Sequence, residues 1–185
     1  MQVFHSLNLD SKADATGLPK VYPVTIRDCN NTASEVFAIE VSIPANDWGD
    51  GELICLEWFA EFRNLAGGSP TLATKIYFGS DSLTLASADG VGSGLARIPY
   101  RLKLWRVGSS IWVPGWESGY GYDVAWHGGA INAVTGSDQF STGKRGGEMT
   151  SIGFSTEKAL KFGVQFSAAG SGLFYTVKGA KVWKI

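Results

Sequence analysis

The sequence predicts an all-β fold, and three observations support that prediction. Glycine accounts for 24 of the 185 residues and charged residues for only 18%, so the composition favours turns over helices. Short stretches in which apolar and polar residues alternate recur along the chain. Between them we find no helical pattern of about 10–15 residues, which argues against a parallel α/β sheet. We therefore expect an antiparallel sandwich of two β-sheets.

Composition and charge exclude several other classes of protein. Aromatic residues make up 12% of the chain and the formal net charge is −1, a profile that does not fit a disordered chain. The near-zero charge gives no electrostatic footprint for nucleic acid. No apolar run is long enough for a transmembrane helix, and the N-terminus lacks the layout of a signal peptide. We expect a protein made in the cytoplasm, without nucleic-acid or membrane partners.

Three strand patterns lie in the first half of the chain. Residues 35–43 alternate, which places Phe37 and Ile39 on one side. Residues 52–62 carry enough apolar side chains for a helix or a buried strand, and their aromatic and β-branched members favour a strand. Residues 71–78 form a third pattern between two clusters of turn residues.

The clearest pattern is a β-hairpin over residues 97–116, with its turn at residues 108–110. Alternation in its first arm separates two faces. The apolar face carries Ile98, Tyr100, Leu102 and Leu104, and the opposite face carries Arg101, Lys103 and Trp105. Since Trp105 falls on the polar face, we expect another chain to cover it.

Two further strands are predicted near the C-terminus. Residues 159–166 alternate, with Phe162, Val164 and Phe166 on one face, and residues 173–185 supply the last strand. In that last strand, strict alternation groups one set on one face: Val177, Gly179, Lys181 and Trp183. A total of about eight to ten strands favours a jelly roll. We expect one domain over residues 1–185, with residues 1–20 as an N-terminal arm.

Catalytic motifs are missing. The two histidines, His5 and His127, accompany no Gly-x-Ser-x-Gly elbow, and Gly143-Lys144-Arg145 does not complete a phosphate-binding loop. Glu57 with Glu61, or Asp47 with Asp50, would act as a glycosidase pair only if their carboxyl groups lay about 5–10 Å apart across a cleft. We expect no catalytic residue and no cofactor.

Two questions about ligation and oxidation stay open at the level of the sequence. Asp47, Asp50 and Glu52 offer oxygen ligands of the kind that calcium prefers, but their spacing is not that of an EF-hand, and Asp-Gly is an ordinary turn pair. We expect no metal site there. Cys29 and Cys55 are either one disulfide or two buried thiols.

A run of aromatic residues marks the most distinctive surface candidate. Such a run serves either as a stacking platform for sugars or as part of a core and a protein interface, and the enrichment of Trp at interfaces favours the second reading. We predict that the interface includes the run and a basic pair in the glycine-rich loop over residues 128–147: Trp105, Trp112, Trp116, Tyr120, Tyr122, Trp126, Lys144 and Arg145.

Two segments resemble small jelly-roll structural proteins of tailed bacteriophages. Residues 162–169, with the sequence Phe-Gly-Val-Gln-Phe-Ser-Ala-Ala, lead through a turn into a closing strand with Val177, Ala180 and Val182. Residues 101–109, followed by Trp112, resemble the middle of the same module. These matches cover under a third of the chain. The turn at residues 170–172 departs from the family pattern, in which Asn commonly follows Ser-Ala-Ala.

The resemblance implies a virion structural protein without catalytic activity: a capsid decoration (cement) protein, a head fibre or a tail-fibre module. Because the chain looks like a bare jelly roll without shaft repeats, we expect a capsid decoration protein. The family resemblance implies a homotrimer and contacts with the major capsid protein or another virion protein. We expect those contacts to include residues 11–19 and 128–147. The alternative is a receptor-binding or carbohydrate-binding module.

Overall fold

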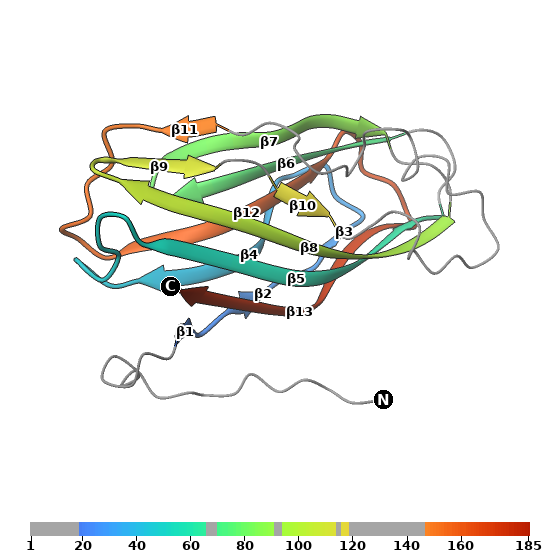
Figure 1. Ribbon diagram of the computed structural model, residues 1–185. Helices are drawn as coiled ribbons and strands as arrows, with labels where there is room; N and C mark the ends of the chain where they lie inside the picture. The colour runs from blue at the N-terminus through green and yellow to red at the C-terminus, as the bar shows by residue number, and fades with distance from the viewer. Residues whose placement is uncertain (1–18, 66–69, 91–93, 114–115, 119–146) are drawn as a thin grey trace.

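The computed structural model describes residues 19–65, 70–90, 94–113, 116–118 and 147–185 (Figure 1). Within these ranges every helix-or-strand element is a β-strand. The strands form two antiparallel sheets, one of eight strands and one of five, which share a single hydrophobic core. This arrangement confirms the predicted all-β fold and the antiparallel two-sheet sandwich.

The larger sheet, here called sheet A, contains the three longest strands of the described chain. Its members are β1 (Lys20–Tyr22), β3 (Cys29–Asn30), β5 (Leu53–Asn64), β8 (Gly94–Val107), β9 (Ser110–Val113), β10 (Trp116–Ser118), β11 (Gly147–Met149) and β13 (Leu173–Lys184). They lie in the order β1-β13-β5-β8-β9-β11, with β10 paired to β8 and β3 paired to β13.

The smaller sheet, sheet B, packs against one face of sheet A. Its members are β2 (Thr25–Ile26), β4 (Val36–Ile43), β6 (Thr71–Phe78), β7 (Asp81–Gly90) and β12 (Lys158–Phe166), in the order β2-β4-β12-β6-β7. The chain crosses between the sheets repeatedly, since β4 lies in sheet B, β5 in sheet A, β6 and β7 in sheet B and β8 in sheet A. The jelly-roll topology itself stays a prediction.

Aromatic side chains from both sheets fill the core. The ring of Trp58 on β5 lies 4.6 Å from that of Phe162 on β12, and the rings of Phe62 and Phe166 lie 5.8 Å apart. The indole Nε1 of Trp58 donates a hydrogen bond of 2.9 Å to the hydroxyl of Tyr175 on β13. This bond satisfies a buried donor where water is excluded, and burial raises the pKa of Tyr175.

The strand predictions for residues 35–43, 52–62, 71–78, 159–166 and 173–185 are confirmed. The predicted hairpin is confirmed over residues 97–113, its turn included, and residues 114–115 lie outside the described residues. Phe162, Val164 and Phe166 share the inner face as predicted. The sequence analysis missed β7, whose Ser, Asp, Ala and Gly residues have weak strand propensity. Of the predicted N-terminal arm, residues 1–18 lie outside the described residues.

Two β-bulges overturn the face assignments that strict alternation gave. In β13 the register shifts between Val177 and Gly179, so Val177 is buried and Lys178 lies on the outer face near Glu61. The prediction that Val177 shares a face with Gly179, Lys181 and Trp183 is therefore wrong. A second shift, between Phe162 and Gly163, turns Phe37 to the outer face of sheet B while Ile39 stays inside. An extra residue in one strand reverses the phase of everything beyond it.

Replacing Tyr175 by Phe should lower the free energy of unfolding by about 1–3 kcal/mol, because the buried indole donor of Trp58 loses its acceptor. Urea unfolding followed by fluorescence measures this change. The matched control is Tyr77→Phe. The Tyr77 hydroxyl bonds Glu35 on the outer face of sheet B, where water can replace it, so this variant should lose only about 0.5 kcal/mol. Equal losses in both variants would contradict the proposed role of the buried bond.

Candidate interface on the outer face of sheet A

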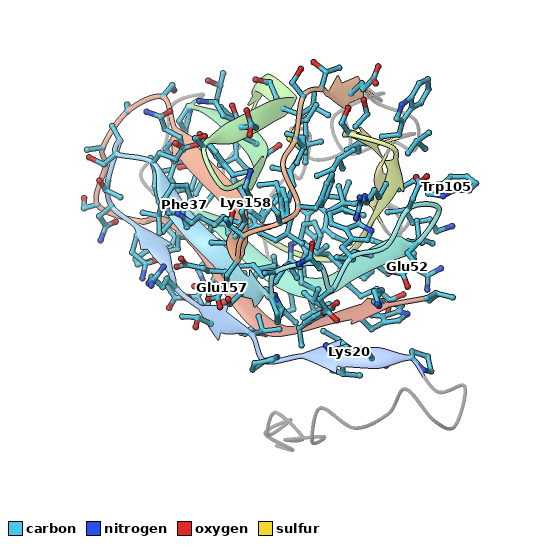
Figure 2. The ribbon with its side chains drawn as sticks, turned by 90° about the vertical axis from the view of Figure 1, so that its left-hand side faces the viewer. Lys20, Phe37, Glu52, Trp105, Glu157 and Lys158 are labelled. Atoms are coloured by element: carbon cyan, nitrogen blue, oxygen red, sulfur yellow. The ribbon has the colours of Figure 1, made fainter. Side chains whose placement is uncertain are left out.

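A row of apolar side chains crosses one end of the outer face of sheet A. Trp105 on β8 lies directly opposite Trp112 on β9, and the two are 51% and 50% exposed. On its other side Trp105 is opposite Leu53 of β5, whose backbone bonds that of Ile185. We call these four residues, together with the neighbouring exposed Val107, the apolar row. Figure 2 shows Trp105 projecting from the sandwich on the side away from Phe37.

Register confirms that Trp105 shares its face with Arg101 and Lys103, since both lie on β8 at the same alternation. The hairpin brings two of the predicted interface tryptophans, Trp105 and Trp112, side by side on this face, and their role in an interface stays a prediction. Trp116 lies in β10 opposite Leu102, and its side chain is outside the described residues. The other predicted interface residues also lie outside the described residues: Tyr120, Tyr122, Trp126, Lys144 and Arg145. The same holds for residues 128–146 of the predicted contact loop.

The indole of Trp105 is fixed in place by the loop between β4 and β5. Its Nε1 donates a hydrogen bond of 3.0 Å to the carbonyl of Gly51. The amide of Gly51, a residue with a φ of +79° that favours glycine, donates to the carbonyl of Arg106 at 3.0 Å. The amide of Arg106 in turn donates to the carbonyl of Glu52 at 3.1 Å. One ring face therefore stays available to a partner without the cost of ordering the side chain.

Asp47 anchors the same loop to the edge of sheet A. Its carboxylate accepts hydrogen bonds of 2.7 Å from Lys20 and 2.7 Å from the hydroxyl of Tyr22, both on β1. Lys184 adds a positive charge 3.9 Å away. Burial alone would raise the pKa of Asp47, but the hydrogen bonds from Lys20 and Tyr22 and the nearby lysine charges outweigh burial and lower it.

The other two acidic residues of the loop also hold structure. Asp50 accepts a hydrogen bond of 2.6 Å from the amide of Gly108, in the turn of the β8–β9 hairpin. Glu52 accepts one from the amide of Gly49 and forms an ion pair of 3.1 Å with Lys184. The three carboxylates considered as calcium ligands thus bind lysines and backbone amides. Among the described residues no group of three or more His, Cys, Asp or Glu side chains is placed to hold a metal ion.

Glu57 and Glu61 do not form a glycosidase pair. They point outward from β5 four residues apart, which separates them by about 13 Å along the strand. Glu57 is paired with Arg101. Glu61 is paired with Arg63 at 2.9 Å and with Arg97 at 3.1 Å. Each carboxylate is therefore neutralised by an arginine of its own, instead of facing the other across a cleft.

The two cysteines are separate buried thiols. Cys29 lies opposite Tyr175 on the inner face of sheet A, whereas Cys55 lies opposite Lys103 on the outer face. The sheet lies between them, which settles the question that the sequence left open. Burial raises the pKa of Cys29 to about 11, so this thiol stays protonated at neutral pH.

The sequence analysis missed three members of the apolar row: Leu53, Val107 and Ile185. Leu53 begins β5 and Ile185 follows the end of β13, and both are distant from the hairpin along the chain. Only the order of strands in sheet A brings them beside Trp105, and a single sequence carries no direct signal for that order. Alternation along residues 97–107 places Val107 on the same face as Trp105, so Val107 could have been predicted from the sequence.

Trp105→Ala and Trp112→Ala should each change the free energy of unfolding by about 1 kcal/mol or less, because half of each side chain is already in water. Trp58→Ala, in the core, should cost about 3–5 kcal/mol. Chemical denaturation of the three variants tests this contrast. If replacing Trp105 or Trp112 lowers the free energy of unfolding as much as Trp58→Ala does, these residues serve stability, and there is no reason to assign them to an interface.

Asp47→Asn should lower the free energy of unfolding at neutral pH by about 1–3 kcal/mol, because Lys20 and Lys184 lose their counter-charge. The folded pKa of Asp47 lies below its usual 3.8, so its contribution is present above that pH and is lost as the pH falls through the folded value. The difference between wild type and variant should therefore shrink below about pH 4. Asp81→Asn, at the start of β7 and outside this network, is the control. A difference independent of pH would contradict the assignment.

Comparison with known proteins gives this chain no family. No protein-family model matches it, and no curated protein matches it either. The described residues contain no helix long and apolar enough to cross a lipid bilayer.

Proposed function

We propose that this chain is a non-enzymatic structural protein of a tailed-bacteriophage virion, and that it decorates the capsid. In this proposal it acts as a cement protein, binding the major capsid protein or another virion protein through the outer face of sheet A. Its location would then be the virion, assembled in the host cytoplasm. The segments that resemble phage jelly-roll modules correspond to β12 with β13 and to the β8–β9 hairpin.

The observation that carries the proposal is the pair of half-exposed indoles on adjacent strands. Trp105 and Trp112 are half exposed to solvent, and their replacement by polar residues would cost the fold little. Tryptophan is among the residues most enriched in the energetic centres of protein interfaces. A fixed indole, as at Trp105, is a suitable anchor because it loses little freedom on binding.

Support for a non-enzymatic role comes from the state of the ionisable groups. Asp47, Glu57 and Glu61 are each engaged with lysines or arginines, so each acts as a structural ion-pair partner. The hollow beside Glu61 is open and shallow, and Phe174 and Lys178 are among its lining residues. General acid–base catalysis needs a group that is free to exchange protons with a substrate, whereas these three carboxylates are held in ion pairs.

A carbohydrate-binding or receptor-binding module is the second candidate, and the same indole pair supports it. Sugar rings stack on exposed aromatic faces, and Trp105 and Trp112 present two such faces side by side. A glycan array separates the two functions. Glycan-dependent binding that disappears in Trp105→Ala and Trp112→Ala would favour the module over the cement protein.

The proposed function predicts that purified protein binds to the heads of the phage that encodes it, in saturable amounts. Quantitative mass spectrometry of purified particles should find the protein in a fixed ratio to the major capsid protein. Light scattering should give the mass of a trimer of 19.8 kDa chains, as the family resemblance implies. Particles without the protein, together with no binding to added heads, would overturn the assignment to the capsid.

A further inference from the structure

The outer face of sheet A concentrates positive charge. On the three long strands β13, β5 and β8, six outward side chains are basic and two, Glu57 and Glu61, are acidic, a net charge of +4. The basic ones are Arg63, Arg97, Arg101, Lys103, Lys178 and Lys181. The whole chain, by contrast, has a formal net charge of −1. The excess of positive charge is therefore a property of these strands and not of the overall composition.

Two of these cations have no carboxylate of their own. The two acidic side chains are taken up by arginines, Glu57 by Arg101 and Glu61 by Arg63 and Arg97. Within the described part of the chain, neither Lys103 nor Lys181 forms an ion pair, and Lys181 lies over the ring of Trp183 at 4.9 Å. Other acidic residues reduce the net charge of this face below +4. Asp28 lines the same hollow as Glu61 and Lys178. Glu117 of β10 is opposite Arg101 in the strand register, and Glu148 of β11 is opposite Trp112.

The outer face of sheet B is different. On β4, β12 and β6 it carries Glu40, Lys161 and Lys75, a net charge of +1. Glu40 is paired with Arg27 at 2.6 Å, and Lys75 lies 3.8 Å from Glu35. This face also lacks exposed tryptophan among the described residues. It therefore serves as an internal control for any claim about sheet A.

We propose that the outer face of sheet A docks onto an acidic protein surface, with the apolar row at one end of the contact and Lys103 and Lys181 facing carboxylates of the partner. The proposal rests on the proposed function for the identity of that partner as another virion protein. Protein interfaces combine an apolar patch with charged groups that meet opposite charge on the partner.

A second copy of the same face is not the partner. Face-to-face pairing of two copies would place the positively charged long strands of one copy against those of the other, and like charges across an interface cost free energy. Glu57 and Glu61, the carboxylates of the long strands, already bind arginines. The like-charge argument therefore excludes a dimer that pairs this face with itself, and a cyclic trimer, which joins two different surfaces, does not require such pairing.

A protein fits the face better than an acidic polysaccharide does. The apolar row includes the aliphatic side chains of Leu53, Val107 and Ile185 beside the two indoles, and Val107 and Ile185 are 52% and 65% exposed. Aliphatic groups gain most from apolar side chains, whereas a sugar gains from flat rings flanked by hydrogen-bonding groups. Binding to an acidic polysaccharide is therefore an outcome that the test has to separate.

The test measures binding of the full chain to heads depleted of it, from low ionic strength to about 0.5 M NaCl. The variant Lys103→Glu/Lys181→Glu reverses the two unpaired charges. Its matched control, Lys75→Glu/Lys161→Glu, makes the same change of net charge on the outer face of sheet B. Lys103→Gln/Lys181→Gln serves if the first variant does not fold, as judged by circular dichroism.

We expect the sheet A variant to bind at least about tenfold more weakly at low salt, the sheet B variant to bind like wild type, and added salt to weaken wild-type binding. Equal binding by both variants would overturn the acidic-surface inference while leaving the proposed function standing. Competition by alginate but not by polyglutamate would replace the protein partner by a polysaccharide. Failure of wild type to bind heads at any salt would remove the proposed function and this inference with it.

Discussion

The hydrogen bonds between the β4–β5 loop and the β8 strand are the constraint on which the candidate interface depends. Gly51 accepts from the indole of Trp105 and donates to the backbone of Arg106, which in turn donates to Glu52. Beneath the loop, Trp48 is buried between Phe78 and Phe154 and donates to the carbonyl of Glu52 at 3.0 Å. An element inside the core therefore sets the orientation of a side chain on the surface. Without this loop, Trp105 would be one more exposed aromatic with several rotamers.

The two outer faces of the sandwich differ in what they leave unsatisfied. On sheet B the hydroxyl of Tyr77 donates to Glu35, in a space kept open by Gly163, where a Cβ atom would lie 2.8 Å from the Glu35 carboxylate. On that face, Lys161 also forms no ion pair among the described residues and lies over the Phe37 ring at 4.5 Å. Sheet A differs in its two half-exposed indoles, which lie on the same face as the unpaired Lys103. An exposed apolar patch of this kind marks an interaction site, and this contrast between the faces is the physical basis for assigning a docking role to one of them.

Local alternation was enough to predict most of the sandwich, because a strand with one buried and one exposed face has alternating apolar and polar residues. The hairpin that carries Trp105 was predicted with its turn and its polar face for that reason. Prediction failed where the cause was not local. The bulges at Lys178 in β13 and at Ala38 in β4 shift the phase of these two strands, and the local sequence pattern did not predict them. Lys20 and Lys184 come to Asp47 from 27 and 137 residues away, so the role of the acidic loop followed only from the strand order.

The central claim is that the outer face of sheet A meets carboxylates of another virion protein. Zero-length carbodiimide cross-linking of the protein bound to heads tests it most directly, because this reagent joins a lysine to a carboxylate only where the two are in contact. Mass spectrometry should find Lys103 and Lys181 linked to Asp or Glu of the partner, and Lys75 and Lys161 of sheet B unlinked to it. Cross-links to the partner from the sheet B lysines alone would contradict the account.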